Sequence, residues 1–531
     1  MSTPTSDAAL RALWEQGQQH IRRRKFARAQ ADFEQLLASA PGHVPARLLL
    51  ASVILAQGRV RGAAEQAKFA AFALPDDADM VCRVAQCLAK VGETLAARAT
   101  LQHPAVQHTR KAPALAALAH IHQGLGQHAE ALALMDRAKA LGFDNADFRF
   151  FRAIQLQFNG NLVEAEAELE ACLKIGPTFG RASVALARLR RWNADENHLG
   201  FIAQRLREVA QGSEDHAGFE FARYKELEDL GRFDEAWDAL ARANALMHAR
   251  LRHDSTAEAA LFDAIIERAT PAFCAPGAHR FDGPQPIFIV GMPRSGTTLL
   301  ERILGRHSQV TPAGELADFS HQWRWVADQH GHRLLDEGLL AAAEAIDFVE
   351  VGRRYLQQTQ WRAAGRSWFV DKLPPNFMLA GFIRKALPQA RILHMRRDPM
   401  DLCFSNWRAL FGDSFGYSYD FATLAAHHRQ YARLMAHWHA VLPGAIHDVD
   451  YVRLASDTEA EARALLDFCG LPFEAACLDD AGNDAPVATL SSAQVREPMR
   501  ARVAEWRRYA SQLEPLRARL EADAEATAME R

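Results

Sequence analysis

Small residues recur at one fixed interval through the first part of this 531-residue chain. Two series, each with a spacing of 34, consist of Gly17, Ala51, Ala85, Ala119, Ala153 and Ala187, and of Ala29, Ala63, Ala97, Ala131 and Ala165. Proline falls on the same interval at Pro41, Pro75 and Pro177. Small residues let two helix backbones approach closely, and proline ends a helix. The pattern therefore predicts stacked pairs of antiparallel helices.

The length of this unit and its small positions resemble the tetratricopeptide repeat over roughly residues 10–190. A further, degenerate unit has Ala236 in the turn GRFDEA. We expect an all-α solenoid over residues 1–250. Such solenoids often bind a peptide or protein partner on their concave face. The alternative is that the repeats only stabilise or dimerise the rest of the chain.

The sequence pattern changes after a Gly- and Pro-containing stretch, and we assign residues 251–283 to a linker. Short apolar runs typical of strands follow at 286–291, 367–372, 391–396 and 445–452. Helical stretches separate them. This alternation predicts an α/β domain with a central parallel sheet over residues 284–531.

Composition excludes several other classes of protein. Lys plus Arg number 62 and Asp plus Glu 65, a formal net charge of -3, so we expect no nucleic acid as partner. No run approaches about 18 apolar residues, which predicts no membrane span, and the N-terminus lacks the apolar core of a signal peptide. Seven scattered cysteines favour free thiols and a cytoplasmic protein. The histidines show no metal-ligand spacing, His437 and His439 being two apart on a helix, so we expect no metal.

A candidate anion-binding loop follows the first predicted strand, in PIFIVGMPRSGTTLLERIL. The backbone N–H groups of residues 294–298 are expected to converge on a helix N-terminus, where unpaired donors and the helix dipole attract anions. Gly291 and Gly296 allow the tight path, and Thr297 and Thr298 add hydroxyl donors. The nucleoside-triphosphate loop GxxxxGK[ST] has Lys where this chain has Thr297, which disfavours ATP, GTP and a kinase.

The loop PRSGTT resembles the 5′-phosphosulfate loop of the sulfotransferases, and Arg294 in it is similar to the tyrosylprotein sulfotransferases. A second segment, RILHMRRDPMDLCFSNW, resembles the 3′-phosphate site of that family, with Arg397 and Ser405 eight residues apart. The two resemblances together imply 3′-phosphoadenosine 5′-phosphosulfate (PAPS) as co-substrate. The implied binding residues are Arg294, Ser295, Gly296, Thr297, Thr298, Arg397 and Ser405.

Each of these segments also has a plainer interpretation. The loop can be a Gly-Thr turn without a ligand. Arg397 can pair with Asp398 or Asp401 at the start of a helix.

The catalytic groups are implied by the same resemblance. Glu315, in TPAGELADF, is similar to the catalytic base of the tyrosylprotein sulfotransferases, and Lys372, in VDKLPPNF, to the family lysine that contacts the bridging oxygen. Arg294 shares the developing negative charge. The alternatives are that Glu315 is an acid at a helix N-terminus and that Lys372 forms a salt bridge with Asp371 or another strand-end acid.

Near the C-terminus, ATLSSAQVREPMRARVAEWRRY resembles the segment that closes over the co-substrate in the same family. The resemblance implies Ser491 and Ser492 at the sulfate or 5′-phosphate, and Arg507 or Arg508 at the 3′-phosphate. A solvated basic helix face explains the arginines equally well.

Three functions remain open at this point. The combination of repeats and sulfotransferase motifs is similar to a known bacterial type of chain, and it predicts transfer of a sulfuryl group from PAPS to an acceptor hydroxyl. The acceptor is either a peptide or protein tyrosine presented by the repeats, or a small molecule, glycan or lipid. The third function is a repeat scaffold whose α/β domain binds a nucleotide without turnover.

Overall fold

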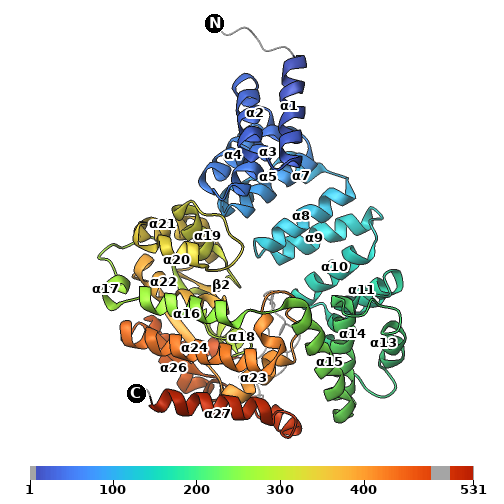
Figure 1. The fold of residues 1–531 in the computed structure, drawn as a ribbon, viewed down its shortest axis with the longest axis vertical. Helices are drawn as coiled ribbons and strands as arrows, with labels where there is room; N and C mark the ends of the chain where they lie inside the picture. Colours follow the sequence, from blue (N-terminus) through green and yellow to red (C-terminus); the bar gives the residue numbers. More distant parts are fainter. Residues whose placement is uncertain (1–6, 480–502, 530–531) are drawn as a thin grey trace.

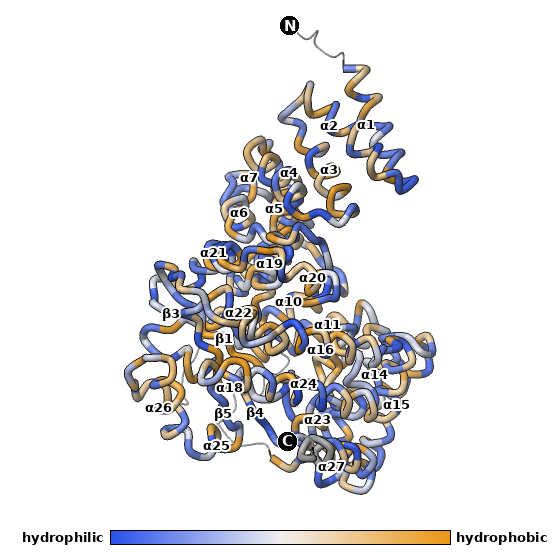
Figure 2. The backbone as a smooth tube through the Cα atoms, turned by 60° about the vertical axis from the view of Figure 1, so that its left-hand side comes forward, coloured by the Kyte–Doolittle hydropathy of each residue, from blue (hydrophilic) through white to orange (hydrophobic). Residues whose placement is uncertain are grey.

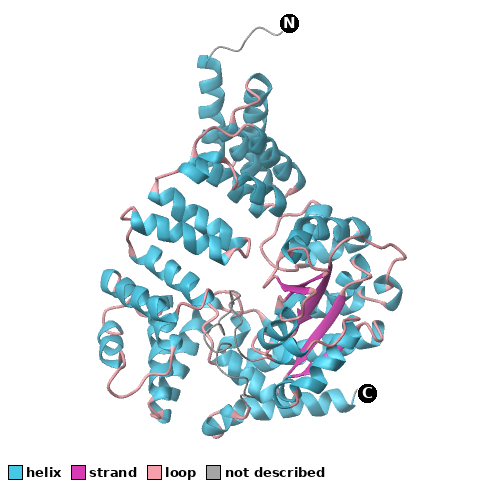
Figure 3. Ribbon diagram, turned by 180° about the vertical axis from the view of Figure 1, so that it is seen from behind, coloured by secondary structure: helices cyan, strands magenta, loops and turns pink. Residues whose placement is uncertain are grey.

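Two bodies of different secondary structure make up the chain in the computed structural model, which describes residues 7–479 and 503–529. A region built only of helices curves around one side of an α/β domain (Figure 1). The strands all lie in the α/β domain (Figure 3). The predicted fold class, an all-α repeat solenoid followed by an α/β domain, is confirmed.

Paired helices form the first body, as the 34-residue spacing predicts. The helices are α1 (Asp7–Arg22), α2 (Phe26–Ser39), α3 (Val44–Ala56), α4 (Arg61–Phe72), α5 (Ala78–Lys90), α6 (Thr94–Thr100), α7 (Pro104–His108), α8 (Ala112–Gly124), α9 (His128–Ala140), α10 (Ala146–Phe158), α11 (Leu162–Ile175), α12 (Gly180–Leu189), α13 (Leu199–Arg205), α14 (Glu214–Asp229) and α15 (Phe233–Leu251). The alanines of both series are buried, none more than 1% exposed. At Gly17 a Cβ atom would lie 2.7 Å from the ring of Phe33, so only glycine allows that approach.

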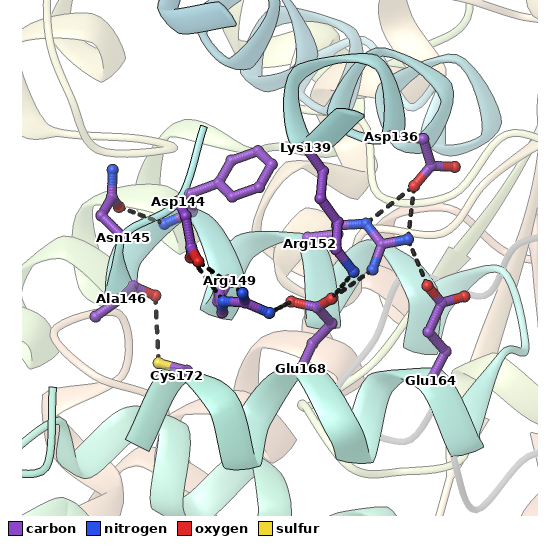
Figure 4. Close-up of polar contacts among 11 residues, drawn as sticks. Asp136, Lys139, Asp144, Asn145, Ala146, Arg149, Arg152, Glu164, Glu168 and Cys172 are labelled. Atoms are coloured by element: carbon purple, nitrogen blue, oxygen red, sulfur yellow. Dashed lines mark hydrogen bonds and ion pairs between the residues drawn. The ribbon is translucent and has the colours of Figure 1, made fainter. Parts of the chain in front are cut away.

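A buried ion network joins two neighbouring repeats (Figure 4). Arg152 of α10 is 4% exposed, and its guanidinium lies 2.6 Å from Asp136 of α9 and 2.8 Å from Glu168 of α11. Glu168 is 3% exposed and also pairs with Lys139 and Arg149. Because buried charges are costly unless paired, these contacts favour one fixed arrangement of the three helices.

The second body is organised by a five-stranded parallel sheet. Its strands are β1 (Gln285–Val290), β2 (Val310–Pro312), β3 (Trp368–Asp371), β4 (Arg391–Arg396) and β5 (Ile446–Asp450), in the order β2-β3-β1-β4-β5. The central strand β1 is buried along its whole length and is coloured as hydrophobic in Figure 2. Phe288 belongs to the apolar cluster on one side of the sheet, and Ile287 and Ile289 to the cluster on the other. Strands covered on both faces are continuous apolar runs in the sequence, which is why β1, β3, β4 and β5 were predicted, whereas the three-residue β2 was not among the predicted runs.

Helices cover both faces of this sheet. They are α18 (Thr297–Gly305), α19 (Asp318–Ala327), α20 (Glu337–Ala341), α21 (Phe348–Thr359), α22 (Ala380–Ala386), α23 (Pro399–Trp407), α24 (Phe421–Val441), α25 (Tyr451–Ser456), α26 (Thr458–Cys469) and α27 (Glu514–Met529). Short 3₁₀ helices include η2 (Gln360–Ala363), η3 (Pro374–Leu379), η4 (Gly416–Tyr419) and η7 (Glu505–Tyr509).

The segment predicted as a linker, residues 251–283, is largely helical instead. It contains α16 (Ser255–Arg268) and α17 (Pro271–Cys274). Asp254 caps α16 by accepting hydrogen bonds from the backbone N–H groups of Thr256 and Ala257. Phe262 is fully buried in the same apolar cluster as the sheet. The apolar face of α16 thus makes this segment part of the α/β domain, which the Gly and Pro residues further on did not reveal.

Turns of the helical repeats dock directly on the α/β domain. Gly58, Gly92 and Gly126 lie 34 residues apart, each with a positive φ in the turn between two helices. The carbonyl of Gly58 accepts a hydrogen bond from His330 N–H (2.8 Å), and that of Gly92 accepts one from Gln322 Nε2 (2.7 Å). The repeat period therefore also spaces the contacts that hold the two bodies together.

Within the described ranges, no helix is long and apolar enough to cross a membrane. All seven cysteines are free, as the sequence predicted.

We predict that Arg152→Ala destabilises the repeats by about 2 kcal/mol, because it removes the most buried of the three cations that pair with Glu168. Arg232→Ala is the control, since the pair of Arg232 with Glu235 is exposed and its loss should leave the free energy of unfolding close to that of the wild type. Urea unfolding followed by circular dichroism measures both. Equal losses in the two variants would contradict a structural role for the Arg152 network.

Candidate active site

The predicted site residues follow the ends of four neighbouring strands. Arg294 follows β1, Glu315 follows β2, Lys372 follows β3 and Arg397 follows β4. Because the strands are parallel, their carboxyl ends share one edge of the sheet, where ligands of open α/β sheets collect. The fold thus brings together four side chains that lie far apart in the sequence.

Close packing and positive φ angles shape the loop after β1. A Cβ atom on Gly291 would lie 2.9 Å from the carbonyl oxygen of Met395, and one on Gly296 would lie 2.5 Å from the ring of Tyr451. Arg294 adopts φ 68°, which is uncommon for a residue with a side chain. Both glycines are therefore required by the neighbouring strand and helix, and the loop holds Arg294 in a strained conformation.

The cationic residues of the two predicted phosphate sites lie side by side. Arg294 Nε donates to Ser405 Oγ at 3.4 Å, and Arg397 Nη1 donates to the backbone oxygen of Arg294 at 3.0 Å. Asn406 also holds the loop, by donating to the carbonyl of Pro293 at 2.8 Å. Burial lowers the pKa of the Arg397 guanidinium, so an anion placed against it would relieve a poorly solvated charge.

The start of α18 supplies further donors. The first backbone N–H groups of a helix have no acceptor within that helix, and Thr297 and Thr298 are its first two residues. Ser295 is fully buried, and its hydroxyl has no hydrogen-bond partner among the described residues. A buried orphan hydroxyl beside a helix N-terminus and two arginines fits a phosphate or sulfate oxygen.

Glu315 and Lys372 meet at the edge of the sheet. Lys372 is 1% exposed, and its Nζ lies 2.7 Å from Glu315 Oε1. Glu301 of α18, which the sequence analysis did not single out, lies 3.9 Å from the same nitrogen and accepts a hydrogen bond from Gly314 N–H. Burial raises the pKa of Glu301. The side chain of Glu315 is 42% exposed, so it can meet a large acceptor.

Asp371 does not pair with Lys372, although the two are adjacent in sequence. Its carboxylate accepts a hydrogen bond from Tyr355 Oη at 2.8 Å and is fully buried. Burial raises the pKa of Asp371 well above its usual value. Successive residues of a strand point to opposite faces, which directs Asp371 into the core below α21 and leaves Lys372 for the site.

Two turns of the repeats border the segment that carries Glu315. Thr94 Oγ1 donates to Asp318 at 3.1 Å, and a Cβ atom on Gly126 would lie 3.9 Å from the carbonyl of Ala313. Buried Glu93 pairs with buried Arg354 of α21 at 3.0 Å. The position of residues 313–318 therefore depends on the helical repeats as well as on the sheet.

The C-terminal predictions have different outcomes. Ser491 and Ser492 lie outside the described residues. Arg508 lies 3.8 Å from Glu228 and over the ring of Phe233, both in the helical region. Nearby, Ala504 N–H donates to Asp401 at 2.7 Å, so this segment lies against α23, which carries Ser405.

A polar chain behind the loop was not predicted. His394 of β4 and Asp448 of β5 are neighbours in the sheet, with His394 Nδ1 2.7 Å from Asp448. His394 Nε2 contacts Tyr431 Oη, and His439 Nε2 lies 3.0 Å from Asp448. His394, His439 and Asp448 form a group whose ligand atoms lie within 4.8 Å of one another. The sequence spacing of His437 and His439 gave no sign of it, because two of the partners come from strands.

Two segments of the chain match models of known families. Residues 286–475 match the sulfotransferase family, and residues 20–81 match the tetratricopeptide repeat. The segment that matches the sulfotransferase family contains the loop after β1 and the residues Glu315, Lys372, Arg397 and Ser405.

Several proteins resemble the chain. A protein of Aquifex aeolicus with no characterised function is 30% identical over 373 residues, 67% of this chain and 48% of that protein. Nodulation protein NoeE of Sinorhizobium fredii is 28% identical over 131 residues, 23% of this chain and 31% of that protein. The chain therefore spans less than half the length of either relative.

Solved structures also resemble parts of the fold. The sulfotransferase domain of the Synechococcus PCC 7002 olefin synthase is 20% identical with a TM-score of 0.32, and the match covers 44% of this chain and 90% of that one. A sulfotransferase from Alicyclobacillus acidocaldarius is 19% identical with a TM-score of 0.27, over 46% of this chain and 96% of that one.

We predict that Glu93→Ala lowers the stability of the protein by about 3 kcal/mol, because it leaves the Arg354 guanidinium buried without this carboxylate. Asn161 occupies the equivalent turn position two repeats later and is exposed, so Asn161→Ala should change stability by less than about 0.5 kcal/mol. Denaturant unfolding measures the free energy of unfolding of both variants and of the wild type. A Glu93 variant as stable as the wild type would show that the interface between the repeats and the α/β domain does not depend on this ion pair.

Proposed function

We propose that the protein is a sulfotransferase that transfers a sulfuryl group from PAPS to an acceptor hydroxyl. The observation that carries this proposal is the meeting of Arg294, Arg397 and Ser405 on one side of the sheet edge with Glu315 and Lys372 on the other. The two arginines and the serine can bind the anionic sulfuryl donor. The glutamate can remove a proton from the acceptor hydroxyl.

Binding of PAPS is assigned to the loop after β1 and to α23. Arg397 and Ser405 offer a planar multi-donor fork and a hydroxyl to the 3′-phosphate. Arg294, Ser295, Gly296, Thr297 and Thr298 would surround the phosphosulfate end. Support comes from the buried hydroxyl of Ser295, which has no hydrogen-bond partner among the described residues, and from the first N–H groups of α18, which have no acceptor within that helix.

The transfer step assigns one role to each side chain. Glu315 takes the proton from the acceptor hydroxyl, whose oxygen bonds to sulfur as the bond from sulfur to the bridging oxygen breaks. Lys372 and Arg294 stabilise the negative charge left on the bridging oxygen of the departing adenosine 3′,5′-bisphosphate. Glu301 and Glu315 both face Lys372, which orients its ammonium group toward the edge of the sheet.

A peptide or protein tyrosine is our first candidate for the acceptor. Glu315 is 42% exposed, and the segment that carries it is bordered by repeat turns at Thr94 and Gly126. An acceptor segment held by the solenoid would reach this carboxylate without entering a deep pocket. A small molecule, glycan or lipid hydroxyl is the alternative acceptor.

The function is tested by incubating the protein with isotopically labelled PAPS and an extract of peptides and metabolites, and by following the label by mass. We expect label to appear on an acceptor only when the protein is present. If label never leaves PAPS, the proposed activity is wrong. A labelled peptide or a labelled small molecule decides between the two kinds of acceptor.

We predict that Glu315→Gln lowers the transfer rate by at least roughly 100-fold and leaves donor binding unchanged, because the amide cannot accept the proton. Glu337→Gln is the control, since Glu337 is an exposed residue at the start of α20 and should keep full activity. Initial rates and calorimetric binding of adenosine 3′,5′-bisphosphate are compared. Loss of binding together with activity would mean that Glu315 belongs to the donor site and is not the base.

A further inference from the structure

A cavity of about 210 Å³ lies where the helical repeats meet the sulfotransferase domain. Its repeat side is lined by Lys90 at the end of α5 and by Val60 and Val91. The other side is formed by α19 and the loop that follows it. The complete lining is Val60, Lys90, Val91, His321, Arg324, His330, Gly331 and His332.

Every titratable side chain in this lining is a base. Lys90 and Arg324 carry positive charge, and the three histidines can each gain a proton. Rings of His330 and His332 lie with their centroids 4.9 Å apart. Burial lowers the pKa of His330, and the nearby charges of His332, Lys90, Arg324 and His321 lower it further. The cavity therefore has a positive potential that favours an anion.

Arg324 gives the cavity a fixed, buried cation. Its side chain is 4% exposed, and Nη2 pairs with Asp336 at 2.7 Å and with the carbonyl of Arg333. Its Nε has no hydrogen-bond partner among the described residues. A buried donor of this kind usually finds a protein group, a water molecule or a ligand.

The acidic groups around the cavity are already engaged. Asp336 pairs with Arg324, and Asp318 accepts a hydrogen bond from Thr94 and lies near Arg362. Asp328 accepts hydrogen bonds from the backbone N–H groups of Val60 and Arg61. None of these three carboxylates lines the cavity.

We propose that this cavity binds a small tetrahedral oxyanion of the phosphate or sulfate class between Lys90, Arg324 and His330. The site is separate from the proposed donor site, because no residue of the loop after β1, nor Arg397 or Ser405, lines it. Its ligand bridges α5 of the repeats and α19, the helix that begins three residues after Glu315. A bound anion would therefore stabilise the contact between α5 and α19, next to the proposed base.

Protonation of the histidines is linked to binding. A bound anion favours the charged imidazolium and raises the pKa of His330, so by linkage the affinity for the anion increases as the pH falls through the histidine range. Burial lowers the pKa of His321, while the charge of Asp318 raises it and that of Arg324 lowers it.

The test uses the full chain with histidines labelled for NMR and inorganic phosphate as the probe. The His330 resonance is identified by its absence in His330→Gln, and its pKa is measured with and without millimolar phosphate. We expect phosphate to raise that pKa by roughly one unit and Lys90→Gln to weaken phosphate binding roughly tenfold. Lys174→Gln is the control, because Lys174 is exposed in the last turn of α11 and should leave binding unchanged.

Sulfate and a phosphomonoester are tested in parallel to distinguish the sources of the oxyanion. Response to phosphate and sulfate supports an inorganic ion, and response to the monoester alone supports a phosphorylated metabolite in the same site. An unchanged His330 pKa with all three ligands, or phosphate binding that is equal in Lys90→Gln and Lys174→Gln, overturns the proposal.

Discussion

The buried contact between Glu93 and Arg354 is the interaction on which the relation of the two bodies depends. Both residues are at most 5% exposed, and the Arg354 guanidinium also lies 3.5 Å from the ring centre of Trp325. Gln322 and Gln358 add hydrogen bonds to the same repeat turn. Since buried charges need fixed partners, the solenoid is held in one orientation against α19 and α21. The same turn then supports residues 313–318 through Thr94, so repeat packing and the proposed base share one framework.

Much of this architecture could be predicted, because it depends on patterns that local physics imposes. Alanines at a 34-residue interval are buried where helices cross, and the apolar run 286–290 is the central strand covered on both faces. Gly291 and Gly296 marked the loop after β1 in the sequence, and in the structure a strand carbonyl and the ring of Tyr451 leave no room for a side chain at these positions. The roles of Glu315 and Lys372 were implied by a family resemblance alone, and the structure brings their side chains to 2.7 Å.

Other features could not be read from the sequence because they depend on contacts between distant segments. Glu301 becomes part of the site because α18 turns its carboxylate toward Lys372, and the helix pattern TTLLERIL gave no sign of that. The chain of Asp448, His394 and Tyr431 depends on the register of β4 with β5. The segment predicted as a linker, residues 251–283, contains α16, whose apolar face is evident only where it packs in the α/β domain.

We propose above all that Arg397 and Ser405, at the edge of the sheet, bind the 3′-phosphate of a nucleotide. Calorimetric titration of the native protein with adenosine 3′,5′-bisphosphate and with adenosine 5′-monophosphate tests it most directly. Arg397 and Ser405 should make the bisphosphate bind at least about tenfold more tightly. Equal affinity for the two nucleotides, or binding of neither, would contradict the account.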